Sequence, residues 1–304
     1  MTFAVAVVQM PVVAGRVDEN RRVAVQFAQT AVAGGAKLVL FPEACVSDIY
    51  HGAQLQAETI PGPSTEALAR VAGEALIALP LLERATDGKT YSACALVSGS
   101  GVRGVARKTH LWRDPQGHDT FHDGEVMSAG AEVSVFDCAG VRVGVLLGFD
   151  AEFPEAFRTL VLRGADVIVV AQNCLAPELA FFSAMARRNC VPVLVANRLG
   201  FRAIYPAAPE ASAFAMPIIM EQDGSAWLRC RGDSAILDEL GHSVAQPRGP
   251  DAPQDEAAPE RVRIPARHFQ EAEILTAALD LETVRARRQA CPFLTERRPA
   301  VYEP

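Results

Sequence analysis

The chain has 304 residues, 50% of them hydrophobic, and it carries a formal net charge of −7. A composition this apolar excludes a wholly disordered chain and provides enough core for a single α/β domain. Nucleic-acid binding is not expected, because it needs clustered Lys and Arg side chains and the basic residues here are dispersed in an acidic chain. The expected partner is therefore a small molecule.

The cysteine spacing and the N-terminal sequence indicate the cellular compartment of the protein. Seven cysteines are scattered along the chain and form no Cys-x-x-Cys pair. This pattern predicts neither a disulfide framework nor a zinc site, and it favours a reducing, cytoplasmic setting. The chain runs from Met1 directly into a strand-like segment, and it has no apolar run long enough to cross a bilayer. We therefore expect neither secretion nor membrane insertion.

Apolar strand-like runs alternate with amphipathic helical patterns from residue 3 to residue 197. Strands are expected at 3–10, 37–41, 76–83, 91–98, 102–108, 132–136, 141–147, 166–171 and 191–197. Helices are expected at 18–34, from 64 onward, at 154–164 and at 177–189. Continuous apolar strands separated by helices indicate sheets covered by helices, which is a layered α/β fold.

Two later segments break this alternation. Residues 201–231 contain three prolines, and we interpret them as an inserted loop or hairpin near the mouth of the site. Residues 247–260 combine prolines with acidic side chains, and they are expected to form a flexible linker. A last helix is expected at 281–289, and residues 1–304 are interpreted as one domain.

Two charged residues follow apolar strands, where open α/β sheets place functional groups. Glu43 ends the stretch Phe41-Pro42-Glu43, and Lys108 lies in the run Arg107-Lys108-Thr109-His110-Leu111-Trp112. Taken alone, a glutamate at a strand end is more often an ion-pair partner or a helix cap, and a lysine there is more often a solvated charge. The other motifs of the chain shift this balance toward function.

Several further motifs occur in the order that is typical of one family. They are Ile60-Pro61-Gly62-Pro63, Gly148-Phe149-Asp150 followed by Phe153-Pro154-Glu155, Asn197-Arg198-Leu199-Gly200, and Ser234-Ala235-Ile236-Leu237-Asp238. Together with the two charged motifs they cover nearly the whole chain. On these residues the chain resembles the nitrilase superfamily of carbon–nitrogen hydrolases, and it is most similar in pattern to the omega-amidase-like branch.

The resemblance implies an α-β-β-α sandwich, usually completed by a dimer, that acts on the C–N bond of a small amide, nitrile or related compound. It assigns Glu43 as the base and Lys108 as the group that stabilises an oxyanion. Asp123 takes the place of an auxiliary glutamate, and its carboxylate reaches about 1.5 Å less far, which weakens a group that needs close placement. The residues expected at the substrate pocket are Phe149, Asp150, Asn173 and Cys174.

Gly148 occupies the position where the resembled family carries its nucleophilic cysteine. Glycine has no side chain, so no thioester forms there, and the loss of a nucleophile costs on the order of 10⁶ in turnover. Three explanations stay open: an engineered substitution that traps substrate, a non-catalytic ligand-binding or assembly subunit, or chemistry in which Glu43 activates a water or an amine. Cys174 and Cys45 are alternative nucleophiles, although most free cysteines only pack.

Two other patterns suggest a cofactor or a metal but have simpler interpretations. Residues 99–104 match a dinucleotide fingerprint, but a strand follows them instead of a helix, so a hairpin turn is expected. His118 and His122, with Asp119 and Asp123, have metal-like spacing without a further identifiable ligand, and the two histidines are interpreted as solvated loop residues. We therefore expect neither a cofactor nor a bound metal.

Overall fold

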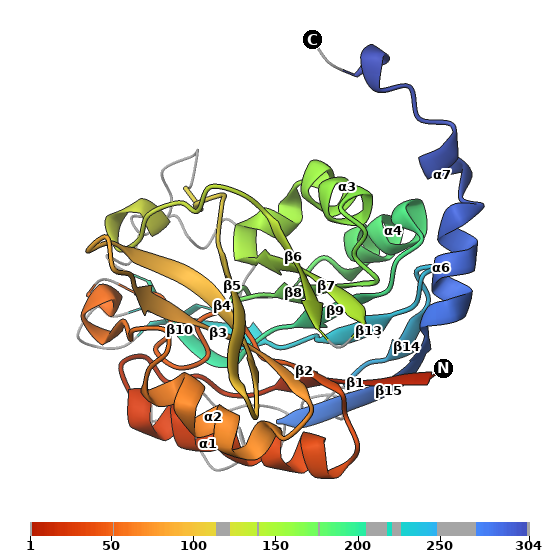
Figure 1. The fold of residues 1–304 in the computed structure, drawn as a ribbon. Coiled ribbons are helices and arrows are strands. Elements are labelled where there is room, and N and C mark those ends of the chain that lie inside the picture. Colours follow the sequence, from red (N-terminus) through yellow and green to blue (C-terminus); the bar gives the residue numbers. More distant parts are fainter. Residues whose placement is uncertain are drawn as a thin grey trace, which may run out of the picture.

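Two six-stranded sheets lie face to face in the computed structural model, which describes residues 2–50, 52–113, 122–138, 140–175, 177–204, 218–220, 226–247 and 272–302 (Figure 1). The strand order in the first sheet is β15 (Glu273–Asp280), β1 (Thr2–Gln9), β2 (Leu38–Leu40), β3 (Leu76–Arg84), β4 (Thr90–Ser98) and β5 (Gly101–Arg107). The order in the second sheet is β14 (Ser243–Ala245), β13 (Ala235–Leu237), β9 (Val193–Ala196), β8 (Val167–Ala171), β7 (Val141–Leu147) and β6 (Ser134–Cys138).

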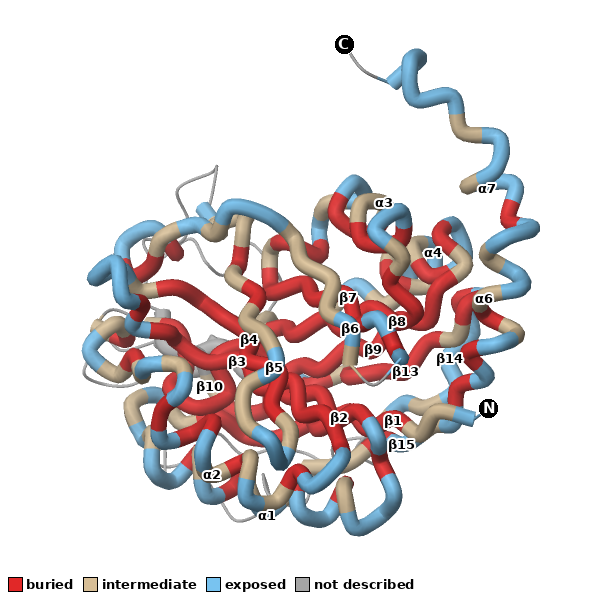
Figure 2. Tube along the Cα trace, viewed as in Figure 1, coloured by how far each residue is buried: buried red, intermediate tan, exposed pale blue. Residues whose placement is uncertain are grey.

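Aliphatic side chains from both sheets fill the space between them. On β1, Val5 and Val7 belong to the core between the sheets, whereas Ala6 and Val8 belong to the core on the opposite face. This division follows from the period of two along a strand, which sends successive side chains to opposite faces. Both faces of the strand are buried, which explains its continuous apolar sequence (Figure 2).

Two pairs of helices cover the outer faces of the sheets. Helices α1 (Val17–Ala33) and α2 (Pro63–Ala72) pack on the first sheet, and α3 (Pro154–Leu162) and α4 (Leu179–Asn189) pack on the second (Figure 1). Each helix buries one apolar stripe, which in α1 includes Val23 and Ala31. The predicted α-β-β-α sandwich is therefore confirmed.

Strand directions bring several loops to one end of the sandwich. Strands β1, β2 and β3 are parallel, and β5 runs the same way because it reverses the direction of β4, which reverses that of β3. Strands β7, β8 and β9 are also parallel. A hydrogen bond from Glu43 N to Gln172 O (3.1 Å) joins the loop after β2 to the turn after β8. The carboxyl ends of both sheets therefore meet there.

The segments outside the alternating pattern are partly described. Within residues 201–231, the described parts belong to a three-stranded sheet of β10 (Leu199–Ile204), β12 (Ala226–Arg231) and β11 (Ile218–Met220). Residues 205–217 and 221–225 lie outside the described residues, and so does nearly all of the expected linker at 247–260. The turn between β4 and β5 is the hairpin expected at 99–104.

The C-terminal elements lead away from the sandwich. Helix α6 (Leu281–Gln289), predicted at these bounds, is followed by α7 (Pro292–Thr295) and the 3-10 turn η5 (Pro299–Val301). Figure 1 shows the last of these projecting from the body of the molecule. Across the described part of the chain, the helices are too short or too polar to span a bilayer.

Candidate active site

Three charged side chains meet where the loops after β2 and β5 approach the 3-10 turn η2 (Asp123–Glu125). Lys108 Nζ lies 3.1 Å from Glu43 Oε1 and 2.7 Å from Asp123 Oδ2. All three side chains are buried, with exposed fractions between 2% and 4%. Ser92 Oγ donates a further hydrogen bond to Glu43 Oε1 at 2.8 Å. The structure thus brings together three of the residues that the sequence motifs single out.

Asp123 reaches Lys108 although its side chain is shorter than the glutamate of the resembled family. The backbone holds it close, since Asp123 N donates to Trp112 O (3.0 Å) and Trp112 N donates to Asp123 Oδ2 (2.8 Å). The expected loss of reach does not prevent a direct ion pair with Lys108. Whether Asp123 is a weaker auxiliary acid stays a prediction.

Burial and charge act in opposite directions on this cluster. Burial raises the pKa of the Glu43 carboxyl above its ordinary value, and the neighbouring Lys108 ammonium offsets part of that rise. Burial alone would lower the pKa of Lys108, but the nearby Glu43 and Asp123 carboxylates outweigh it and leave the pKa raised. The lysine therefore stays cationic near neutral pH, and the glutamate accepts a proton more readily than an exposed one.

Gly148 faces this cluster from the opposite sheet. It directly follows β7, begins the 3-10 turn η3 (Gly148–Glu152), and has a positive φ of 47°. A Cβ atom at this position would lie 2.3 Å from Glu43 Oε2 and 2.8 Å from Lys108 Nζ. The Glu43 carboxylate and the Lys108 ammonium therefore stand directly against the backbone of Gly148.

Asp150 ties the turn at Gly148 to the segment that follows Lys108. Its buried carboxylate accepts hydrogen bonds from Thr109 Oγ1 (2.6 Å) and from the backbone N of His110 (2.7 Å). The His110 ring contributes a further contact, with Nδ1 2.8 Å from Asp150 Oδ1. These donors occupy the carboxylate, so the geometry supports a role in holding the two loops rather than the expected contact with substrate.

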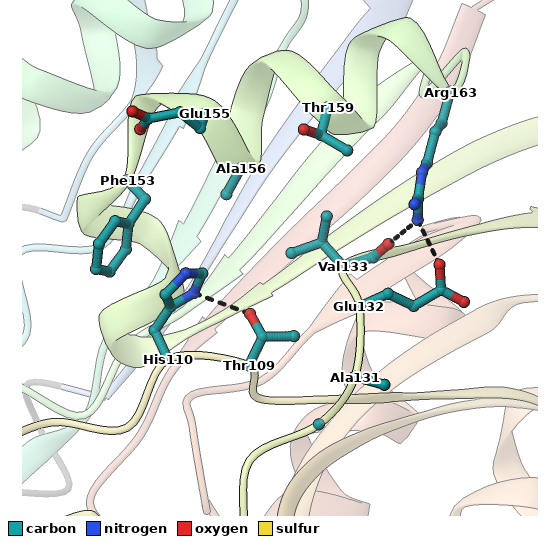
Figure 3. Close-up of a pocket in the computed structure, with 11 residues that line it drawn as sticks. Thr109, His110, Ala131, Glu132, Val133, Phe153, Glu155, Ala156, Thr159 and Arg163 are labelled. Atoms are coloured by element: carbon teal, nitrogen blue, oxygen red, sulfur yellow. Dashed lines mark hydrogen bonds and ion pairs between the residues drawn. The ribbon is translucent and has the colours of Figure 1, made fainter. Parts of the chain in front are cut away.

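Aromatic side chains cluster around the turn that begins at Gly148. Phe149 makes edge contacts with Trp112 (5.3 Å between centroids) and with Phe153 (5.2 Å), and Phe153 stacks on His110 (3.9 Å). Beyond His110 lies an open pocket of about 580 Å³ between α3 and the residues that precede β6 (Figure 3). Glu43, Lys108 and Gly148 do not line this pocket.

The loop after β2 holds Glu43 through long-range contacts. Ala44 and Asp48 have positive φ values of 49° and 67°, which is rare for residues other than glycine. The buried Asp48 carboxylate pairs with the fully buried Arg198, and it accepts a hydrogen bond from Asn173 Nδ2 at 2.9 Å. Strained backbone of this kind persists only when the surroundings over-determine it.

The two candidate replacement cysteines have different surroundings. Cys45 is buried and donates from Sγ to Pro80 O (3.3 Å), and burial raises the pKa of its thiol well above the usual range, which disfavours the reactive thiolate. Cys174 is partly buried in the turn after β8, and its backbone N donates to Asn197 Oδ1 at 3.1 Å. Asn173 and Cys174 directly follow Gln172, whose carbonyl accepts a hydrogen bond from Glu43 N, and their contact with substrate stays a prediction.

Sequence reasoning missed Ser92, Asp48 and the role of Arg198. Each is a polar residue buried among apolar neighbours, and that is the signal by which such residues are found. Among the described residues there is no group of three or more His, Cys, Asp or Glu side chains arranged to hold a metal ion. His118 and Asp119 lie outside the described residues.

Comparison with known proteins places this architecture in a family. The chain is 31% identical over 175 residues to an (R)-stereoselective amidase from Pseudomonas sp., covering 55% of this chain and 61% of the relative. It is 28% identical over 311 residues to omega-amidase NIT2 from Bos taurus, covering 99% and 97%. Several other curated relatives are matched over only 61% to 62% of their length.

The fold and the sequence pattern of the chain both match known carbon-nitrogen hydrolases. The fold superimposes on a carbon-nitrogen hydrolase from Helicobacter pylori G27 with a TM-score of 0.73, at 18% identity and over 99% of this chain and 97% of that one. The pattern of the carbon-nitrogen hydrolase family matches residues 4–289. From its sequence pattern and its sandwich fold, the chain belongs to the carbon-nitrogen hydrolase family.

Proposed function

We propose that this protein is an amidase-like hydrolase that cleaves the C–N bond of a small amide, nitrile or related compound without a protein thiol. The carrying observation is the buried cluster of Glu43, Lys108 and Asp123 set directly against Gly148. A buried carboxylate and ammonium facing a backbone without a side chain can activate a small nucleophile but cannot form a thioester.

In the proposed reaction, Glu43 takes a proton from a water molecule as the water oxygen bonds to the amide carbon. The Lys108 ammonium stabilises the negative charge that develops on the carbonyl oxygen. Glu43 then gives its proton to the nitrogen as the C–N bond breaks, so that an amide and water yield a carboxylic acid and ammonia or an amine. The raised pKa of Glu43 suits a group that both accepts and returns a proton.

The alternative is a catalytically inactive subunit that binds a ligand or a partner. Two contacts favour it. Lys108 Nζ already pairs with two carboxylates, and the Glu43 carboxylate lies close to the backbone of Gly148, so both charged groups are already engaged within the protein. Glu43→Gln separates the two functions. An enzyme should lose its turnover, whereas a binder should keep most of its affinity.

The direct test is ammonia release from a panel of primary amides and nitriles, with Glu43→Gln as the matched variant. Release by the unaltered protein that the variant lacks would support the proposal. Gly148→Cys belongs in the same panel. If only the cysteine variant releases ammonia, the scaffold is that of a thiol amidase and the proposed thiol-free chemistry is wrong.

We also propose that the chain forms a homodimer. The proposal rests on two points. The family that the sequence resembles usually completes this sandwich fold by dimerisation, and apolar side chains such as Val301 and Tyr302 are exposed on the C-terminal segment. Sedimentation of the intact chain tests it.

A further inference from the structure

Two free cysteines lie where the C-terminal segment meets the end of α4. Cys190 directly follows α4, has a positive φ of 48°, and is partly exposed. Cys291 directly precedes α7 and is buried. Helix α7 packs against α4, so the two cysteines belong to the same junction although a long stretch of sequence separates them.

The side chains of Arg158 and Arg188 hold this junction together. Arg158, on α3, donates to Arg188 O (3.0 Å) near the end of α4 and to Phe293 O (2.7 Å) in α7. The guanidinium carbon of Arg188 lies 4.4 Å from the centre of the Phe293 ring. Arg188 is two residues before Cys190, and Phe293 is two residues after Cys291. These contacts therefore fix the backbone beside both thiols.

The two thiols interact with each other and share a cationic neighbour. The Cys291 side chain is a hydrogen-bonding neighbour of the Cys190 thiol, and the Arg158 guanidinium interacts electrostatically with both. Burial, and then the contact with Cys291, raises the pKa of the Cys190 thiol to about 12, and Arg158 offsets part of this rise. Thiolate is therefore scarce at neutral pH and reaction is slow, but a disulfide formed on Cys190 has a second sulfur beside it.

We propose that Cys190 and Cys291 form a reversible disulfide that fastens the C-terminal segment to α4 under oxidising conditions. The oxidant is a low-molecular-weight disulfide such as glutathione disulfide. Cys190, the more exposed of the two, loses its proton and attacks one sulfur of the oxidant, which forms a mixed disulfide and releases one glutathione. Cys291 then loses its proton and attacks the Cys190 sulfur, which releases the second glutathione. The two cysteines are oxidised and the glutathione disulfide is reduced. This modification does not depend on the proposed C–N chemistry.

The test is incubation of the intact protein in a glutathione redox buffer, followed by blocking of free thiols and peptide mapping by mass spectrometry. We expect two peptides joined through Cys190 and Cys291, which dithiothreitol separates. Cys138→Ser is the matched control, because Cys138 is also a half-buried thiol whose pKa is raised by burial, but it lies on β6. This variant should form the same bond, whereas Cys190→Ser and Cys291→Ser should not.

The bond should also raise thermal stability, because it closes the long loop from 190 to 291 and so restricts the unfolded chain. We expect the oxidised protein to melt roughly 5 °C higher than the reduced one, with no such shift in Cys291→Ser. Four results overturn the inference: a mixed disulfide that persists on Cys190, a bond from Cys190 to any other cysteine, no oxidation, or a bond that leaves the melting temperature unchanged. Mapping and melting of the unaltered protein decide this even if a variant does not fold.

Discussion

The backbone at Gly148 and the side chains around it disfavour a side chain at this position. Its positive φ of 47° is unfavourable for any residue with a Cβ, and a Cβ there would approach Glu43 Oε2 to 2.3 Å. Glu43 cannot retreat freely, because Ser92 and Lys108 hold its carboxylate. A cysteine at this position would require the Glu43 carboxylate and the Lys108 ammonium to shift from their present places.

Gly148→Ala should lower the free energy of unfolding by about 2 kcal/mol or more, because strained φ and overpacking each cost on the order of 1–3 kcal/mol. Gly88→Ala is the control, since Gly88 has a positive φ of 81° and open space around its missing Cβ. It should lose only about 1–2 kcal/mol, the cost of the backbone alone. Urea unfolding of both variants measures the difference, and equal losses would contradict the close approach of Glu43.

Glu43 should make stability depend on pH. Its pKa is raised in the folded state above the ordinary value of 4.5, so its contribution to stability is present below pH 4.5 and is lost as the pH rises through the raised value. Glutamine stays neutral throughout. The stability of Glu43→Gln relative to the unaltered protein should therefore improve as the pH rises above 4.5. Denaturant unfolding across this range measures it, and a constant difference would mean that Glu43 is not buried as described.

The boundaries of several helices and strands could be predicted from the sequence. β7 and α6 have the predicted bounds, and α3 begins at the predicted Pro154, because apolar periodicity and the helix-starting proline are local signals. Glu43 and Lys108 could be placed at strand ends for the same reason. β2 is only three residues long, shorter than the predicted 37–41, although Phe41 N still donates to Ala78 O of β3 (3.1 Å) before the chain turns into the loop at Glu43.

The links between elements could not be predicted in the same way. Asp48 and Asn173 are 125 residues apart, and Thr109 and Asp150 are 41 apart, so no local period relates them. Each partner alone has the sequence appearance of an ordinary turn residue. Such pairs follow only from the sheet order, which brings the ends of β2, β5, β7 and β8 together. Asp150 was accordingly expected at the substrate pocket rather than as a link between loops.

Asp150→Asn tests that link between the β5 and β7 loops. The change leaves the donors from Thr109 and His110 facing an amide in place of a carboxylate, and it should cost on the order of 3 kcal/mol of stability. Asp137→Asn is the matched control, because Asp137 is exposed on β6 and accepts one bond from Gly140 N at 3.3 Å. Thermal unfolding should separate the two variants clearly, and an Asp150 variant as stable as the control would show that the loops are held by other contacts.

The sandwich as a whole concentrates its polar chemistry at one end, and the last residues of its C-terminal segment project from the body. Both sheets are buried on two faces, so the interior has little room for charge except at the strand ends. Directly after α6 the chain still contacts the body, since Cys291 is buried and Leu294 packs against the core beneath α3 and α4. Phe293, Val301 and Tyr302 are 42%, 61% and 61% exposed, and this end of the chain projects from the body in Figure 1.

A second copy of the chain is the partner we propose for these side chains. Burying a side chain of this size contributes about 1.5–3 kcal/mol, so replacing both Val301 and Tyr302 with serine should weaken dimerisation at least about tenfold. Leu55→Ser is the control, because Leu55 is 75% exposed on the 3-10 turn η1 (Ala53–Gln56), far along the chain from this segment. Sedimentation equilibrium over a range of concentrations measures the constants. A monomeric intact chain would reject the dimer, whereas equal dimerisation by both variants would place the interface on another surface, since neither change alters the sandwich core.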